Sequence, residues 1–218
     1  MRLSTTALLS LPLLAAAGPV SLSLNIGNDM TITPEQLEQI APESKSCDNA
    51  PAPGQCATAA QAASVISKSF ETYKVTSRAE QAAVIGIMAF ESGQFKYNKP
   101  VNPTPGKGTR NMQSPTFNQQ YASALNLPTA GKAPDAILDL ILANEENDFG
   151  SGAWFLTATC HADVRTALQT GSEEGWEQYI TQCVGTQATA ERKEFWTRAM
   201  QALGVQAGTG AGARVKKC

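Results

Sequence analysis

The segment that decides the fold spans residues 77–95 and reads SRAEQAAVIGIMAFESGQF. Ser77 and Glu80, the first and fourth residues of the segment, have the spacing of a capping box. In this motif two side chains satisfy free amides at a helix start. Apolar residues then recur three and four positions apart, which is the period of a helix with one face buried in a core. The pattern ends on Glu91. We therefore expect a buried helix that ends on a carboxylate.

The rest of the chain has the same helical period and lacks the long alternating runs that are typical of strands. Residues 98–112 contain three prolines and two glycines, and this predicts a loop or small hairpin beside helix 77–91. Gly150 and Gly152 are expected to separate two helices, and His161 to lie at a helix start. Further helices are expected at about 35–40, 57–73, from Pro115, from Pro134, 154–159, 173–183 and 188–203. The fold class is therefore all-α.

The length, composition and first residues of the chain predict a single secreted domain. The 218 residues are 42% hydrophobic with a formal net charge of -2, which argues against nucleic acid as a partner. Arg2 precedes an apolar stretch, residues 7–17, that is typical of a secretory signal and too short to span a bilayer. We expect an extracellular monomer without a membrane partner. Its expected parts are a signal peptide (1–17), an N-terminal arm (18–56), a catalytic domain (57–204) and a flexible tail (205–218).

The five cysteines fit an oxidising compartment. None forms a C-x-x-C pair, so a zinc ribbon or a thioredoxin-like site has little support. Proximity in sequence favours the pairs Cys47–Cys56 and Cys160–Cys183, which leaves Cys218 over. A bridge from Cys218 to the body of the protein, or to a second chain, stays open as an alternative.

Glu91 is the leading candidate for catalysis. It lies four and three positions after Ile87 and Met88, so it shares their buried helix face. Burial disfavours the ionised form of a carboxyl group, and a carboxylic acid held protonated near neutral pH can protonate the leaving oxygen of a glycosidic bond. The alternative is a helix-end residue that turns to solvent or pairs with Lys96 or Arg110.

Two motifs resemble a known family. Residues 87–95 read IMAFESGQF and residues 106–113 read GKGTRNMQ, a combination similar to the lysozyme-like superfamily of lytic transglycosylases and goose-type lysozymes. The closest resemblance is to secreted fungal muramidases. It implies a lysozyme-like helical domain in which Glu91 is general acid and then base. Arg110 and Asn111 occupy a place where lytic transglycosylases have small residues and Gly-Leu, so the lytic product chemistry is not carried over.

The resemblance also implies roles for the residues around Glu91. Ser92 and Gln113 would bind the acid or the sugar by hydrogen bonds, Gly108 and Thr109 would form the turn beside the cleft, and Met112 would pack beneath it. The polar loop, which includes Asn111, could bring amides and hydroxyls close to a sugar chain. The substrate-binding candidates are Ser92, Tyr97, Gly108, Thr109, Asn111, Met112, Gln113 and Tyr121.

A second carboxylate could assist Glu91. Glu145, Glu146 and Asp148 cluster where an apolar helix is expected to end, and we favour Asp148 as base or nucleophile. A solvated acidic helix end, or catalysis by one Glu alone, remains the alternative. Tyr97 and Tyr121 are the aromatic candidates for stacking on sugars. The tryptophans at positions 154, 176 and 196 fit a core better.

Other function classes lack their signals. His161 is the only histidine and no G-x-S-x-G elbow is present, so a Ser-His-Asp hydrolase and a zinc site are disfavoured. No nucleotide-binding glycine motif occurs, and no metal or other cofactor is expected. The sequence thus predicts a muramidase that cleaves the polysaccharide of bacterial peptidoglycan. The alternatives are a chitin-directed hydrolase and a non-catalytic wall-glycan-binding or effector protein.

Overall fold

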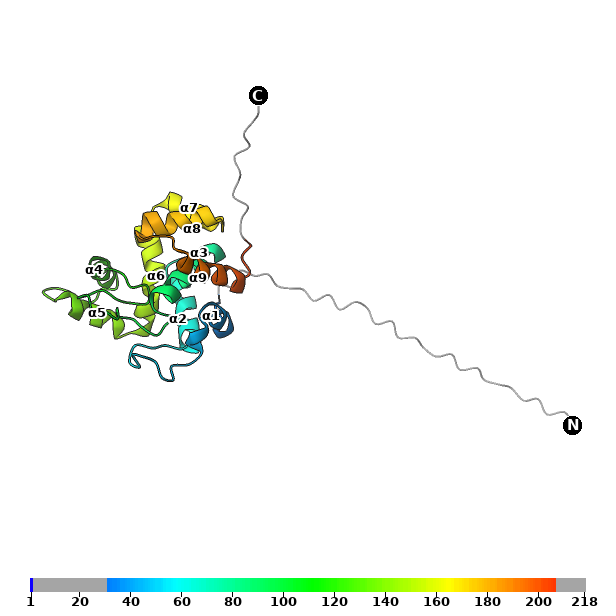
Figure 1. The fold of residues 1–218 in the computed structure, drawn as a ribbon, viewed down its shortest axis with the longest axis horizontal. Helices are drawn as coiled ribbons and strands as arrows, with labels where there is room; N and C mark the ends of the chain where they lie inside the picture. The colour runs from blue at the N-terminus through cyan, green and yellow to red at the C-terminus, as the bar shows by residue number, and fades with distance from the viewer. Residues whose placement is uncertain (2–30, 207–218) are drawn as a thin grey trace, which may run out of the picture.

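The computed structural model describes Met1 and residues 31–206, which form a helical domain (Figure 1). The predicted signal peptide after Met1 lies outside the described residues, and so does Cys218, the cysteine that the two favoured pairs leave over. The elements are α1 (Pro34–Ile40), η1 (Pro42–Lys45), α2 (Ala59–Thr72), α3 (Arg78–Glu91), α4 (Pro115–Ala124), α5 (Pro134–Leu142), α6 (Glu145–Thr159), α7 (Ala162–Gln169), α8 (Glu173–Gln178), the π-helix η2 (Tyr179–Val184) and α9 (Ala190–Ala202). Within residues 31–206 the β-structure is limited to one isolated bridge, so the predicted all-α class is confirmed. None of these helices is both long and apolar enough to cross a membrane.

Helix α3 is the centre of the fold, and its first turn differs from the predicted capping box. The Ser77 hydroxyl accepts a hydrogen bond from the Glu80 amide, as expected. The Glu80 side chain, however, is buried and pairs with Arg165 of α7, with 2.7 Å between Oε1 and Nε. Every residue of α3 from Ala79 to Ala89 is buried. The tertiary contact to α7 therefore replaces the second half of the capping box.

Helix α9 packs against α3 at the middle of the molecule, with α7 and α8 on one side and α4 and α5 on another (Figure 1). Gly86 makes this contact close. A Cβ at position 86 would lie 3.0 Å from both the backbone N and the Cα of Trp196 on α9. Trp196 in turn stacks on Trp176 of α8, with ring centroids 5.1 Å apart. Leu37 and Ile40 of α1 complete the same core.

The acidic cluster and the two glycines near position 150 belong to one helix, which corrects the predicted break. Asn144 caps α6, and the cluster of acidic side chains therefore lies in its first turn, where carboxylates favour the helix dipole. Helix α6 continues through Gly150 and Gly152. Glycine is needed at these positions because neighbouring side chains approach the backbone closely. A Cβ at Gly152 would lie 3.0 Å from the sulfur of Met88. A glycine that permits tight packing has the same sequence signal as one that ends a helix.

The two favoured disulfides are present. Cys47–Cys56 closes the loop that follows η1, and Cys160–Cys183 joins the end of α6 to η2. His161 lies at the start of α7 beside the second bridge, as expected.

We expect Gly86→Ala to destabilise the protein even though alanine is the better helix former. Overpacking costs about 1–3 kcal/mol, against about 1 kcal/mol gained in helix propensity. The crowded atoms belong to the backbone of α9, so they cannot rotate away. Urea unfolding measures the change, which should be a loss of up to about 2 kcal/mol. Gly54→Ala is the control, because a Cβ there meets nothing within 4 Å. Equal stability of both variants would contradict the packing argument.

Candidate functional site

A groove crosses the C-terminal end of α3, and Glu91 lies in its middle. The groove consists of three adjoining cavities of about 410, 390 and 490 Å³. Glu91 and Met112 line the first two, and Tyr97 and Val101 line the last two. Lys107 lines all three. An elongated groove of this kind suits a polymer better than a small molecule.

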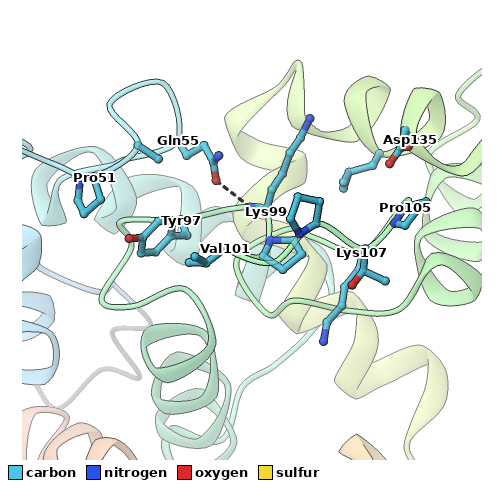
Figure 2. A pocket seen from close by; sticks show the side chains of 13 residues that line it. Pro51, Gln55, Tyr97, Lys99, Val101, Pro105, Lys107 and Asp135 are labelled. Carbon is cyan, nitrogen blue, oxygen red and sulfur yellow. Dashed lines mark hydrogen bonds between the residues drawn. The ribbon is translucent and has the colours of Figure 1, made fainter.

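The walls of the groove come from segments far apart in the sequence. The first cavity is lined by residues of α3, η2 and the start of α9, and also by residues 111–115 and α4. The last cavity is mainly apolar, with Pro51 and Tyr97 at one side and Pro105 at the other (Figure 2). Tyr97 therefore lies where the sequence placed it, beside the groove. The apolar patches around a polar centre can receive the faces and substituents of sugar rings.

Glu91 forms an ion pair with Arg192, which the sequence did not indicate as its partner. The Nη2 atom of Arg192 on α9 lies 3.0 Å from Glu91 Oε1, and the two side chains are 16% and 20% exposed. Arg192 also lies over the ring of Phe90, 4.6 Å from its centroid. The two cations considered from the sequence have other partners, since Lys96 binds the carbonyl of Ser46 and Arg110 binds Asp148. Glu91 is thus ion-paired at the middle of the groove, with Arg192 and not with Lys96 or Arg110.

Asp148 lies in the core and does not line any of the three groove cavities. It is 2% exposed, and its Oδ2 lies 2.9 Å from Arg110 Nε and accepts a hydrogen bond from Asn98 at 3.0 Å. Burial raises the pKa of the Asp148 carboxyl, while the Arg110 guanidinium opposes that rise. This position disagrees with the expected role as a second catalytic carboxylate. Asp148 lies on the buried side of the first turn of α6, and the acidic composition of this turn did not indicate that burial.

The Arg110–Asp148 pair anchors the loop that forms one wall of the groove. Arg110 donates hydrogen bonds to the carbonyls of Phe95 and Tyr97, at 2.9 and 3.3 Å. Its guanidinium also lies 4.7 Å from the centre of the Phe149 ring. Burial lowers the pKa of Arg110, and the Asp148 charge opposes this effect. One buried cation thereby ties residues 95–110 to α6.

A chain of side-chain hydrogen bonds continues from this anchor to the groove. Ser151 on α6 and Thr109 both donate to Asn111 Oδ1, at 2.8 and 2.7 Å. Asn111 donates to Gln113 Oε1 at 3.3 Å, and Gln113 donates to Asn118 Oδ1 at 2.7 Å. Asn111 and Gln113 line the groove, as does Met112 between them. These three predicted residues are brought together at Glu91.

Gly108 and Thr109 shape the turn without lining the groove. Gly108 forms the isolated bridge with Gln113, and a Cβ on it would lie 2.7 Å from the carbonyl oxygen of Asn98. Thr109 is fully buried and has a φ of 65°, in the left-handed region. Their expected place in the turn is therefore observed, while direct contact with a substrate is not supported by their positions.

Ser92 and Tyr121 are internal, which corrects their expected place as binding residues. The Ser92 hydroxyl donates to the carbonyl of Met88 at 2.6 Å and accepts from the amide of Phe95 at 2.9 Å. Tyr121 donates to the carbonyl of Asn147 at 3.0 Å, and its ring packs on Trp154 in a second core cluster. Ser92 ends the helix and supports the turn behind Glu91. Its proximity to Glu91 in sequence suggested contact with a sugar that its buried side chain does not allow.

No cluster of three or more His, Cys, Asp or Glu side chains suited to a metal ion occurs among residues 31–206. Of the described residues lining the three cavities, the carboxylates are Glu91 and Asp135. Asp135 lies in the last cavity and accepts a hydrogen bond from the Gly106 amide at 2.7 Å. Glu91 is therefore the one carboxylate at the middle of the groove.

Comparison with known proteins identifies the fold. No family model matches the chain. Over 160 residues it is 40% identical to a bifunctional dioxygenase–epoxy alcohol synthase of Fusarium oxysporum strain Fo5176; this covers 66% of the chain but only 12% of that relative. A chitinase C mutant has a similar structure, with a TM-score of 0.58, 14% identity and coverage of 84% of this chain and 97% of the other. A bacterial family 19 chitinase has a TM-score of 0.56 and 15% identity, with coverage of 81% of this chain and 97% of the other. The chain has the lysozyme-like helical fold of these structures.

We expect Asp148→Ala to unfold the protein far more easily, because it leaves Arg110 charged and unpaired in the core. Breaking a buried ion pair in this way costs about 3–5 kcal/mol. Urea unfolding measures the loss. Asp139→Ala is the matched control, since Asp139 pairs with Lys99 but is 62% exposed, and surface pairs contribute about 0–1 kcal/mol. Similar small losses in both variants would show that the Arg110–Asp148 pair does not anchor the loop.

Proposed function

We propose that this chain is a secreted glycoside hydrolase that cleaves the glycan backbone of bacterial peptidoglycan, with Glu91 as the proton donor. The observation that carries the proposal is the position of Glu91. A carboxyl group at the end of the most buried helix opens into the middle of an elongated groove. Asn111, Met112 and Gln113, which the sequence resemblance associates with a cleft, line the same groove.

The chemistry requires two proton transfers at Glu91, one from the residue and one to it. Glu91 in its protonated form donates to the glycosidic oxygen as the bond from that oxygen to the anomeric carbon breaks. A water molecule then adds to the anomeric carbon and returns a proton to Glu91, so the same residue serves as acid and base. The absence of a second carboxylate among the described residues beside Glu91 is consistent with this scheme.

Chitin is the second candidate substrate. Two structures with this fold are named as chitinases, and chitin shares N-acetylglucosamine with peptidoglycan. The dioxygenase and synthase activities named for the Fusarium relative are not carried over, because the matched part is 12% of that protein.

We expect Glu91→Gln to lose about 10²–10⁴-fold in turnover, the usual contribution of a general acid. The glutamine keeps the shape of the side chain but cannot donate the proton. Clearance of a bacterial cell-wall suspension, followed by turbidity, measures the rate. Glu177→Gln is the control, because Glu177 is exposed and does not line the groove. Equal clearance by all three proteins would remove Glu91 from the mechanism.

The same proteins distinguish the substrates. We expect release of reducing ends from peptidoglycan at a rate that exceeds cleavage of a chitin hexasaccharide. Faster cleavage of the hexasaccharide would favour the chitinase alternative. Binding to walls without cleavage of either substrate would identify a non-catalytic glycan-binding protein.

A further inference from the structure

The groove is cationic although the protein is not. The chain has a formal net charge of -2. The two cavities that share Glu91 are nevertheless lined by Lys99, Lys107 and Arg192, and Glu91 is the only carboxylate among the described residues that line them. A local excess of cations over carboxylates concentrates anionic ligands. The distribution of charge therefore points to an anionic ligand.

Arg192 is fixed in one wall of the groove. Its Nη2 atom contacts Glu91, its Nη1 atom donates to the carbonyl of Gln187 at 3.2 Å, and the guanidinium lies over the ring of Phe90. Its Nε atom is buried and has no hydrogen-bond partner within the described residues. Arg192 thus presents a cation in a set orientation at the first cavity.

Lys107 supplies a second cation to the same cavity. Its backbone amide donates to the carbonyl of Thr104 at 3.0 Å, in the loop anchored by Arg110. Its side chain forms no ion pair with any residue in the described part of the chain. Lys99, by contrast, pairs with Asp139, and Figure 2 shows the Lys99 and Lys107 side chains pointing in opposite directions. Lys107 is therefore the cation in the groove that is available to a ligand.

We infer that Lys107 and Arg192, which line the same cavity as Glu91, form a subsite for the carboxylate groups of an acidic glycan. The inference rests on the proposed function and gives it a substrate class. Chitin is uncharged, and its deacetylated form is cationic, so neither would gain from two cations in the groove. The peptide-bearing strands of peptidoglycan carry carboxylates along the glycan and match the charge. The subsite distinguishes the two polymers, which share a sugar.

Binding measured without turnover tests the subsite. The probes are purified peptidoglycan and the same material after its carboxylates have been converted to amides. In a Glu91→Gln background, the additional change Lys107→Gln should weaken binding to native peptidoglycan about three- to fivefold, the scale of one partly exposed charge pair. It should leave binding to amidated peptidoglycan unchanged. Lys107→Arg should keep the preference for the native material. Lys132→Gln, an exposed lysine that does not line the groove, is the matched control.

Two outcomes would overturn the inference. In the first, Lys107→Gln weakens binding to native and amidated peptidoglycan equally, which would indicate a role in the shape of the groove and not in charge. In the second, Lys107→Gln changes binding to neither material. Arg192 is a poorer test position, because its removal also leaves Glu91 without its partner. The proposed function fails separately, if the protein with Glu91 intact cleaves neither material. The binding comparison does not depend on cleavage, so the two failures are distinguishable.

Discussion

The close contact between α3 and α9 is the constraint on which the site depends. Gly86 has no side chain, so the backbone of α9 approaches α3 closely at Trp196. This contact places Arg192, one turn earlier on α9, beside Glu91 at the end of α3. The two residues are 101 positions apart in sequence. Their pairing is a consequence of helix packing, and any change in the crossing of these helices would alter the charge at the centre of the groove.

The second wall depends on a buried charge. Residues 98–113 have little regular backbone structure, yet they must hold Asn111, Met112 and Gln113 at the groove. The Arg110–Asp148 pair provides this anchor from the core. A buried ion pair adds little net stability compared with an apolar pair of similar size, but it is expensive to break. Such a pair therefore stabilises one loop conformation over others. The hydrogen bonds made by Asn111 connect this anchored part of the loop to the residues that line the groove.

Charge within the groove bears on function more directly than the net charge of the chain. A slightly acidic composition predicts no preference for an anionic ligand. The structure gathers Lys107 and Arg192 around a single carboxylate, while most acidic side chains lie elsewhere. Under the proposed function, such a local excess of positive charge would favour an acidic polymer. The fold, which is shared with structures named as chitinases, does not determine this preference.

The sequence by itself determined the helical class and the position and end of α3. It also favoured the two disulfide pairs that are observed, and it pointed to the loop that contains Asn111, Met112 and Gln113. These features depend on local spacing, since helix periodicity, caps and proline or glycine breaks act within a few residues. The sequence did not reveal Arg192, the buried place of Asp148, or the continuity of α6 through Gly150 and Gly152. Those were decided only by tertiary structure. The partners that stabilise a charge or require a glycine come from distant segments, and burial is a property of the assembled core.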